Sequence, residues 1–570
     1  MTLAPGDVLD AAQAHGPAAA SRAAHAAPRP AWINLVPTAD VVRRAAAVEP
    51  DAPLAGVPFG IKDNLDLAGL PTTSANPALA DAPAATSAVA VARLAAAGAV
   101  AIGKTNMDQF ATGLVGTRSP YGACACVADP AYVSGGSSSG SAVAVASGVV
   151  PLALATDTAG SGRVPAAFNG LVGIKPTRGL VSTRGLAPAC RSLDCVTTLS
   201  RTVGLGRSAL AALVWTDPED PWSRPRPPHP PAGVATTMRV VAVPAGPLDL
   251  DPAHAAAWDV AVARLRRLVP HVVEVDISAF LAAAKLLYEG PFLAERWAGF
   301  GHLLDPDGPH LDPTVRGIVA RGAAIDGASV FAAQDTLAGL RRATDGTWAD
   351  IDALMLPVTP NHPTRAEVAA DPVGVNRRLG TYTNFVNLLD LCAVAVPADP
   401  RADGLPYGVQ FVAPAFADDP LLDLAGAWCG EATPVPPVPG GSSLLAVAGA
   451  HMSGLALNPQ LTAAGGVLRY RARTAPAYRL FRLNVPGVAR PGLVRTGDGP
   501  AGGVAVEVWQ LPHQGVGALL DLIPAPLGLG RVELDDGTLV TGFLAEEYAT
   551  RDATDVTHHG SWRAALAAVA

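Results

Sequence analysis

Two loops rich in glycine and serine constrain this chain more than any other feature of its sequence. The first covers residues 135–141 and includes Ser137, and the second covers residues 158–162 and includes Ser161. A short apolar segment that is suited to burial separates them. Each loop offers a hydroxyl beside flexible backbone, because glycine reaches conformations that other residues avoid. A single loop of this kind is as readily a linker as a site, so its interpretation depends on what accompanies it.

The length of the chain and its prolines indicate more than one domain. A chain of 570 residues is long for a single hydrophobic core, and a hydrophobic content of 49% is enough for large cores. Residues 433–443 are dominated by proline and glycine and are typical of a semi-rigid linker. We therefore expect a first domain at residues 1–432, the linker at 433–443 and a second domain at 444–570.

The two domains are expected to belong to different fold classes. In the first, helix-like segments at 87–97 and 141–147 alternate with strand-like segments, of which 99–103, 354–358 and 392–396 are the clearest. Alternation of strands and helices predicts an α/β sheet that helices cover on both faces. The second domain is expected to be smaller and mostly β, because residues 478–483, 505–510, 530–534 and 539–546 alternate like strands.

Charge and hydropathy exclude several classes of partner. The formal net charge is only −8, and no run of lysine and arginine offers a stripe for phosphates, so nucleic acid is not expected. No segment is long and apolar enough to cross a bilayer, and the start of the chain lacks the pattern of a signal peptide. The six cysteines lack the paired spacing of metal motifs, which favours a reduced, cytoplasmic protein.

Lys62 is the third group that changes the interpretation of the two loops. Amide hydrolysis requires a nucleophile, a group that takes its proton, and donors for the developing oxyanion. Lys62 follows an apolar segment at residues 57–61. Lysine acts as a base only when it is neutral, and burial in such a setting lowers its pKa. A lone lysine after a strand is more often a surface residue, but its occurrence together with both loops favours a site.

With these residues in place, the chain resembles the amidase signature family over roughly residues 40–430. Further segments that match the family lie at residues 98–106, 173–177 and 404–410. The resemblance implies that Ser161 is the nucleophile, that Ser137, which follows a cis peptide, relays a proton, and that Lys62 is the base. It also implies a mixed sheet covered by helices and an oxyanion hole made by the backbone N–H groups of Thr158, Ala159 and Gly160.

Tyr288 and Arg296 suggest how the substrate is recognised. They are eight positions apart, so on one continuous helix they would share a face, although Gly290 and Pro291 interrupt a regular helix. An arginine fork binds a carboxylate through two hydrogen bonds, and tyrosine adds one further donor. The pair therefore predicts a small anionic amide as substrate, unless Arg296 serves only a surface ion pair.

Within that family the whole chain, second domain included, resembles the allophanate hydrolases. Tyr288, Arg296 and Gly113 match the positions that hold the substrate in those enzymes. The resemblance implies hydrolysis of allophanate, which is urea-1-carboxylate, to ammonia and N-carboxycarbamate in the first domain. It also implies a homodimer in the cytoplasm, with a separate urea carboxylase as a metabolic partner.

The second domain resembles the one attached to those enzymes, which is related in fold to γ-glutamyl cyclotransferases. The implied role is decarboxylation of N-carboxycarbamate to carbamate, which then decays to ammonia and carbon dioxide. That reaction needs a proton on nitrogen, and histidine is well suited near neutral pH, so His451 is the expected catalytic residue. Arg473 and Tyr478 are candidates to hold the carboxylates. The scheme requires no metal and no organic cofactor.

Four alternatives stay open at this point, of which a scaffold that keeps the fold without chemistry is the weakest, because all three residues of the triad are present. The first domain would also suit an amidase for another small or aryl amide. It would suit the glutaminase subunit of a tRNA-dependent amidotransferase, which gives no reason for the second domain. The second domain would serve equally as a binding or assembly module with no chemistry of its own.

Overall fold

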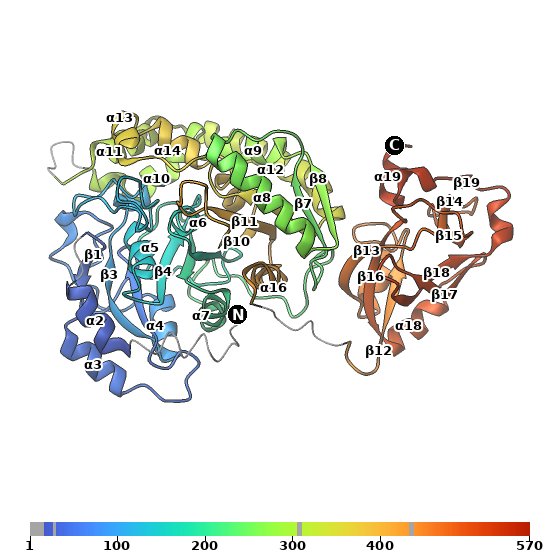
Figure 1. The fold of residues 1–570 in the computed structure, drawn as a ribbon, viewed down its shortest axis with the longest axis horizontal. Helices are drawn as coiled ribbons and strands as arrows, with labels where there is room; N and C mark the ends of the chain where they lie inside the picture. The colour runs from blue at the N-terminus through green and yellow to red at the C-terminus, as the bar shows by residue number, and fades with distance from the viewer. Residues whose placement is uncertain (1–15, 27–29, 305–309, 432–437, 570) are drawn as a thin grey trace.

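A computed structural model describes residues 16–26, 30–304, 310–431 and 438–569. Parts of the expected first domain, at residues 1–15, 27–29, 305–309 and 432, and of the expected linker, at residues 433–437, lie outside the described residues. Figure 1 shows a large α/β unit that is followed along the chain by a smaller unit built mainly from strands.

The large unit is built on one mixed sheet of eleven strands. In order across the sheet they are β1 (Trp32–Leu35), β3 (Val100–Thr105), β2 (Pro58–Lys62), β4 (Leu152–Asp157), β6 (Cys195–Ser200), β5 (Val172–Lys175), β10 (Leu391–Pro397), β11 (Gly408–Pro414), β9 (Ala353–Pro357), β7 (Val240–Pro244) and β8 (His271–Val275). β2 is parallel to β3 and β4, and β7 is parallel to β8 and β9. The neighbouring pairs from β4 to β9 are antiparallel, so the predicted mixed α/β sheet is confirmed.

Apolar side chains of the large sheet point alternately into two separate cores, one on each face. In β7, Val241 and Val243 belong to one core, whereas Val240 and Ala242 belong to the other. This alternation follows from the pleat of a strand, in which successive side chains face opposite sides. Both cores are covered by helices: α8 (Pro252–Leu268) and α16 (Asp418–Cys429) pack on the first, and α9 (Ser278–Glu289), α12 (Gly327–Asp350) and α15 (Asn384–Leu388) pack on the second.

Most of the other helices of the large unit are short. The helices predicted at residues 87–97 and 141–147 are present as α4 (Val89–Ala96) and α5 (Ser139–Ala146). The strands predicted at residues 99–103, 354–358 and 392–396 are present as β3, β9 and β10. The remaining α-helices are α2 (Gly16–Ala26), α3 (Thr38–Ala46), α6 (Arg163–Phe168), α7 (Val203–Leu213), α10 (Leu293–Phe300), α11 (Pro313–Ala320), α13 (Arg365–Ala370) and α14 (Gly374–Leu379). The 3₁₀ turns are η1 (Pro77–Leu79), η2 (Gln109–Ala111), η3 (Gly301–Leu303) and η4 (Arg321–Ala324).

The smaller unit contains a five-stranded and a three-stranded sheet. The first has the order β13 (Val467–Arg473), β16 (Ala505–Pro512), β12 (Ser442–Val447), β18 (Leu539–Ala545) and β17 (Leu527–Glu533), and the second has β15 (Pro491–Arg495), β14 (Tyr478–Arg482) and β19 (Thr554–Asp555). Its helices are α17 (Asn458–Ala463), α18 (His513–Leu520), α19 (Trp562–Ala567), η5 (Glu547–Thr550) and η6 (Thr557–His559). The prediction of a smaller, mostly β unit is confirmed. Of the helices in the part of the chain that the structure describes, none has the length and apolar character needed to cross a membrane.

A segment of the large unit packs into the smaller one. Residues 234–237 run beside β13, where the N–H groups of Thr236 and Thr237 donate to backbone carbonyls at 3.0 and 2.8 Å. Ala235 belongs to the apolar core of the smaller unit. The core of the second unit is therefore completed by residues that lie far before it in the chain.

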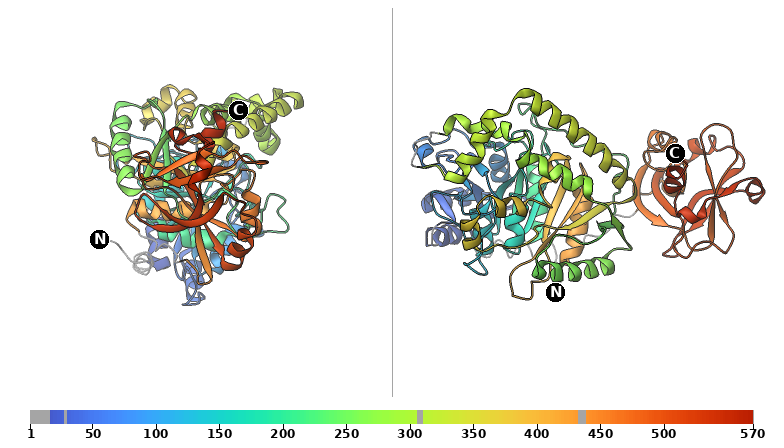
Figure 2. Two further views of the ribbon diagram at one scale, coloured as in Figure 1. Left: turned by 90° about the vertical axis from the view of Figure 1, so that its right-hand side faces the viewer. Right: turned by 90° about the horizontal axis from the view of Figure 1, so that it is seen from above.

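A buried ion pair reinforces this contact between the two units, which lie end to end in Figure 2. Arg471 of β13 donates to Asp352 of the large unit at 2.5 Å, and their side chains are 5% and 0% exposed. The other carboxylate oxygen of Asp352 accepts from the N–H groups of Arg239 and Val240. The carboxylate is thus fully hydrogen-bonded at the junction of the two units.

Candidate active site

Lys62, Ser137 and Ser161 come together at the carboxyl ends of two neighbouring strands. Lys62 is the last residue of β2, and Ser161 lies in the loop between β4 and α6. Because β2 and β4 are parallel neighbours, their carboxyl ends lie at the same edge of the sheet. Ser137 precedes α5, whose small residues allow the helix to pack on both strands.

The amino group of Lys62 is completely buried and faces Ser137. Its Nζ donates to Ser137 Oγ and to Thr156 Oγ1, each at 2.7 Å. Burial lowers the pKa of Lys62 to about 7, against the opposing charge of Asp194. The amine is therefore neutral in a large fraction of molecules near pH 7, as a base must be. Thr156, which also accepts from Asn64 at 3.2 Å, was not among the residues predicted from the sequence.

The loops that carry Ser137 and Ser161 are joined by a backbone hydrogen bond. Ser137 follows a cis peptide bond with Gly136, as the resemblance to the family implied. The N–H of Ser138 donates to the carbonyl of Ser161 at 3.2 Å, which holds the two loops together. The hydroxyl of Ser161 donates to the carbonyl of Gly113 at 3.5 Å. Ser161 is thus placed beside the predicted relay and beside a residue predicted to hold the substrate.

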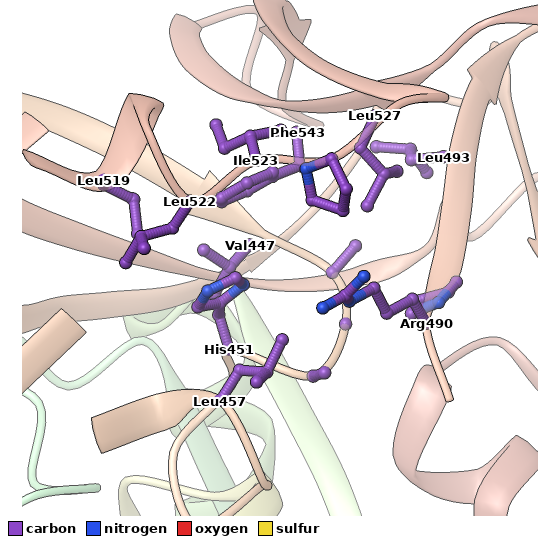
Figure 3. A pocket seen from close by; sticks show the side chains of 15 residues that line it. Val447, His451, Leu457, Arg490, Leu493, Leu519, Leu522, Ile523, Leu527 and Phe543 are labelled. Carbon is purple, nitrogen blue, oxygen red and sulfur yellow. The ribbon is translucent and has the colours of Figure 1, made fainter. Parts of the chain in front are cut away.

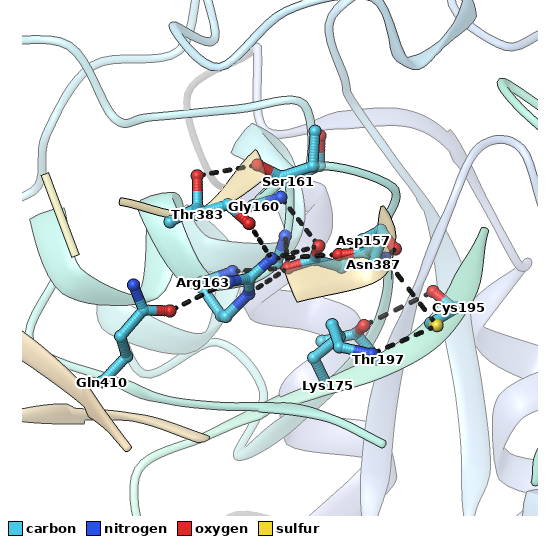
Figure 4. A network of polar contacts seen from close by, with 12 residues as sticks. Asp157, Gly160, Ser161, Arg163, Lys175, Cys195, Thr197, Thr383, Asn387 and Gln410 are labelled. Carbon is cyan, nitrogen blue, oxygen red and sulfur yellow. Dashed lines mark hydrogen bonds and ion pairs between the residues drawn. The ribbon is translucent and has the colours of Figure 1, made fainter. Parts of the chain in front are cut away.

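A buried ion pair fixes the loop of Ser161 (Figure 4). The guanidinium of Arg163 donates to both oxygens of Asp157, through Nε and Nη2, each at 2.9 Å. The same carboxylate accepts from the N–H groups of Gly160 and Gly162 at 2.7 and 3.2 Å. Burial alone would raise the pKa of Asp157, but the charge and hydrogen bonds of Arg163 more than offset burial and hold that pKa below its usual value.

The oxyanion hole stays a prediction, and one of its predicted donors is already engaged. The N–H of Gly160 donates to the carboxylate just described, so it is not available to an oxyanion in this geometry. The carbonyl of Ala159 accepts from the hydroxyl of Thr383 at 2.7 Å, and the hydroxyl of Thr158 donates to Asp194. These contacts fix the backbone of the two residues whose N–H groups remain the candidates.

Asp108 fixes the backbone of a further segment at the site, and this role was not predicted from the sequence. Its buried carboxylate accepts from three N–H groups of residues 115–118, at 2.9 to 3.2 Å. A Cβ at Gly113 or at Gly136 would come within 2.6 or 2.1 Å of the same carboxylate. Both positions therefore need glycine for this close approach. The role of Asp108 depends on contacts with distant segments, which its local sequence does not reveal.

Arg296 and Tyr288 meet, but on two helices rather than one. Tyr288 lies on α9 and Arg296 lies on α10, so the single helix considered from their spacing is not formed. The break falls at Gly290 and Pro291. Arg296 Nη2 donates to Tyr288 Oη at 3.3 Å, and Nη1 donates to Thr112 Oγ1 at 3.0 Å.

Arg296 is a buried cation whose neighbours leave part of it unpaired. It is 1% exposed, which removes the alternative of a surface ion pair. Its hydrogen bonds within the described part of the chain go to neutral hydroxyls, and its Nε has no partner there. Because a buried charge is costly unless it is paired, this position suits an anionic ligand.

His451 lies at a cavity of the smaller unit (Figure 3). Its Nε2 is 2.9 Å from Gln460 Oε1, and its ring stacks on Phe543 with ring centroids 4.9 Å apart. Burial lowers the pKa of His451. Figure 3 shows His451 and Arg490 on one side of the cavity, with apolar side chains of residues 519–527 across from them.

Arg490, rather than Arg473 or Tyr478, accompanies His451 at this cavity. Arg473 donates to a backbone carbonyl at 2.8 Å, and Tyr478 is fully buried, with its Oη accepting from a backbone N–H at 2.9 Å. Neither of these two residues lines the cavity of His451. Arg490 stands in the connection between β14 and β15, and only the folded sheet brings it to His451.

The residues that the structure describes offer neither a metal-binding cluster nor a disulfide. No group of three histidine, cysteine, aspartate or glutamate side chains lies close enough there to hold a metal ion. All six cysteines are free thiols, and five of them are buried.

Two family models match the chain, one for each unit. The model described as amidase matches residues 18–422. The chain belongs to the amidase family. The model described as the allophanate hydrolase C-terminal domain matches residues 443–567. The large unit is therefore an amidase domain, and the smaller unit is a domain of the second type.

Similar proteins show the same combination of units. The urea amidolyase of Lachancea kluyveri is 40% identical over 568 residues, which cover 94% of this chain and 31% of that relative. The solved structure of selenomethionine-substituted Kluyveromyces lactis allophanate hydrolase is 37% identical, with a TM-score of 0.72, and the match covers 100% of this chain and 99% of that one. The chain spans about a third of the length of the urea amidolyases that it matches.

A component of an amidotransferase resembles the amidase domain alone. This glutamyl-tRNA(Gln) amidotransferase component, from Natronomonas pharaonis, is 34% identical over 422 residues, which cover 67% of this chain and 97% of that relative. A third of this amidase-family chain has no counterpart there, in contrast to the allophanate hydrolase structure.

Proposed function

We propose that this chain hydrolyses allophanate, with ammonia released in the amidase domain and carbon dioxide released after a second reaction in the smaller domain. The observation that carries the proposal is the buried, incompletely paired guanidinium of Arg296 beside Tyr288. Allophanate has a terminal amide at one end and a carboxylate at the other. A guanidinium that binds the carboxylate through two hydrogen bonds would therefore present the terminal amide to Ser161. Similarity to an allophanate hydrolase over the whole chain supports the same substrate.

In the amidase domain, Ser161 attacks the carbonyl carbon of the terminal amide. Ser161 Oγ gives its proton to Ser137, which passes its own proton to the neutral Nζ of Lys62. The same groups return a proton to the departing nitrogen, so ammonia leaves and an acyl-enzyme remains. Water then attacks the acyl carbon in the same way, restores Ser161 and releases N-carboxycarbamate. Each N–H group that stabilises the oxyanions contributes about 3 kcal/mol to the lowering of the barrier.

In the smaller domain, one carbon–nitrogen bond of N-carboxycarbamate breaks. Carbon dioxide leaves, and the electron pair of that bond takes up a proton on nitrogen. His451 delivers this proton from its imidazolium form, and Arg490 binds the carboxylate that remains. The product, carbamate, takes up a further proton and decays to ammonia and a second carbon dioxide. Because burial lowers the pKa of His451, its protonated form is the stronger acid.

The cellular setting is part of the same proposal. We place the protein in the cytoplasm as a homodimer, with a urea carboxylase that supplies allophanate. Free and mostly buried thiols are typical of a reducing compartment, which supports the cytoplasm. Similarity to urea amidolyases supports a place in the breakdown of urea.

Ammonia release on three substrates tests the first reaction. Allophanate is compared with malonamate, which keeps the carboxylate and the terminal amide, and with an uncharged aryl amide. Strong preference for allophanate supports the proposal. Activity on the uncharged amide alone would keep the amidase chemistry and overturn the role of Arg296. Ser161→Ala, which removes the nucleophile and leaves the fold, measures the background.

Carbon-13 NMR on the same reaction tests the second step. A catalytic smaller domain converts N-carboxycarbamate onward as fast as it forms. A domain that serves only binding or assembly would leave N-carboxycarbamate to accumulate and to decay at its uncatalysed rate. Wild type and His451→Ala are compared under conditions in which the first ammonia is released at equal rates.

A further inference from the structure

One buried carboxylate fastens the turn that carries His451. Ser453, two residues later, donates to Glu507 through its N–H at 2.7 Å and through its hydroxyl at 2.5 Å. Glu507 lies on β16, which pairs with β12, the strand that leads into this turn. Glu507 is fully buried and does not line the cavity of Figure 3, so it holds the turn from behind.

Four donors converge on the two oxygens of this carboxylate. Oε1 accepts from Ser453 Oγ and from Arg563 Nη2 at 3.0 Å. Oε2 accepts from the N–H of Ser453 and from Trp509 Nε1 at 3.1 Å. A glutamine of the same shape has one oxygen only, so its NH₂ group would face two donors in either orientation. Position 507 is therefore built for a carboxylate.

Arg563 supplies the charge that a buried carboxylate needs. Its side chain is 12% exposed, and its Nη2 also donates to the carbonyl and the hydroxyl of Ser453 at 2.6 and 3.1 Å. Its Nε lies 3.3 Å from Asp350 of the amidase domain, but that carboxylate is 59% exposed. Exposed ion pairs contribute little to stability, so the buried Glu507, rather than Asp350, holds the guanidinium of Arg563 in place.

We propose that Glu507, held by Arg563, is a positioning residue for the second reaction. By fixing the turn, it keeps the ring of His451 at the cavity that it shares with Arg490. Gln460 holds the ring itself, so Glu507 acts on the backbone that carries the ring. The inference rests on the proposed function of the smaller domain.

The full-length chain with Glu507→Gln tests this role beside wild type and His451→Ala. Each is given carbon-13 allophanate, and NMR follows N-carboxycarbamate and bicarbonate while ammonia is assayed. We expect Glu507→Gln to slow decarboxylation about ten- to a hundredfold, because a small misplacement of a catalytic group has effects of this size. The first ammonia should appear at the wild-type rate. Adding Glu507→Gln to His451→Ala should cause no further loss, since Glu507 acts through His451.

A readout other than activity separates positioning from general stability. With nitrogen-15 histidine, the imidazole resonances of His451 should shift in Glu507→Gln. Arg563→Met should slow decarboxylation, and Arg563→Lys, which keeps the charge, should retain most of the rate. Asp350→Asn is the matched control: it removes the exposed carboxylate from the same guanidinium and should leave both the rate and the His451 resonances unchanged.

The outcomes distinguish this inference from the function on which it rests. Normal decarboxylation and unchanged His451 resonances in Glu507→Gln would overturn the inference when His451→Ala is slow. Normal decarboxylation in His451→Ala would overturn the proposed function of the domain as well. If Glu507→Gln does not fold, Ser453→Ala decides, because it keeps the carboxylate and removes one tether. Ser453→Ala should slow decarboxylation several-fold, and an unchanged rate would overturn the inference.

Discussion

Lys62 Nζ lies 2.7 Å from Ser137 Oγ, and both residues are completely buried. At this distance a neutral amine takes the hydroxyl proton directly, whereas an ammonium group only donates to that hydroxyl. The protonation state of this one buried lysine would therefore decide whether the proposed serine relay begins. This contact has consequences both for the rate of the reaction and for the stability of the fold.

The rate of the amidase reaction should rise with pH through about 7. Burial lowers the pKa of Lys62 to about 7, so the neutral base is the minor form below that pH and the major form above it. We expect kcat/KM to fall about tenfold for each pH unit below the pKa. Malonamate is the substrate of choice because its carboxylate is stable in acid. A profile that stays flat on both sides of pH 7 would mean that Lys62 is not the titrating base.

Replacing Lys62 should stabilise the folded protein. Below about pH 7 the lysine is charged in the folded and the unfolded chain, and the folded chain bears the full cost of burying that charge. Between that pH and the ordinary lysine pKa of 10.5, the folded chain holds fewer protons than the unfolded chain, so the cost falls as the pH rises. Lys62→Met should therefore raise the free energy of unfolding by a few kcal/mol at low pH.

Urea unfolding of wild type and Lys62→Met at pH 6 and at pH 9.5 measures this effect. The advantage of the variant should be largest at the lower pH and smaller at the higher one. Lys104, a buried lysine in an ion pair with Asp63 at 3.1 Å, offers a contrast. Lys104→Met removes the partner of a buried carboxylate and should destabilise the fold instead. Equal stability of wild type and Lys62→Met at both pH values would contradict the prediction.

Arg296 should determine specificity for anionic amides. Arg296→Met removes the fork that would bind the carboxylate, and we expect kcat/KM for allophanate to fall about a hundredfold or more. The rate on a small uncharged amide should change little. Tyr288→Phe removes one hydroxyl that contacts the guanidinium at 3.3 Å and should cost about tenfold. Equal losses on charged and uncharged substrates would show that Arg296 supports the fold rather than the carboxylate.

Local sequence was enough to predict the buried strands and to single out the two serine loops and Lys62, which the structure brings together. The strands at 354–358 and 392–396 are runs of apolar residues that both faces of the sheet bury, and they correspond to β9 and β10. Ser137 and Ser161 stand in loops whose glycines are visible without the fold. These features depend on neighbours in the sequence, which is why a single sequence reveals them.

Features that depend on distant segments were not predicted. The importance of Asp108 is visible only from the N–H groups and glycines that converge on its carboxylate in the folded chain. Arg490 is recognised only because it lines a cavity that other segments form. The segment at residues 234–237 joins a core whose other members come more than two hundred residues later. A single helix that carries both Tyr288 and Arg296 is not formed, because α9 ends before Gly290 although the spacing of the two residues suits one helix face.

Arg490 should matter for the second reaction alone. Arg490→Met removes a cation from the cavity of His451, so binding of N-carboxycarbamate should weaken and this compound should accumulate while ammonia release in the first step continues. Arg479 of the same domain, which forms ion pairs with Asp498 and Asp555 at the surface, provides the matched control Arg479→Met. Carbon-13 NMR of the reaction mixture measures both variants. Equal accumulation in both would remove the special role of Arg490.

The ion pair between Arg471 and Asp352 should hold the two units together. Both side chains are nearly inaccessible, so Arg471→Met leaves a buried carboxylate without its cation, and such a loss typically costs about 3 to 5 kcal/mol. Breaking the exposed ion pairs of Arg479 with Arg479→Met should lower the free energy of unfolding by less than about 1 kcal/mol. Thermal unfolding followed by separate probes in each unit should show one transition in wild type and two in Arg471→Met. A single unchanged transition would show that the β13 contact and the shared apolar core suffice to join the units.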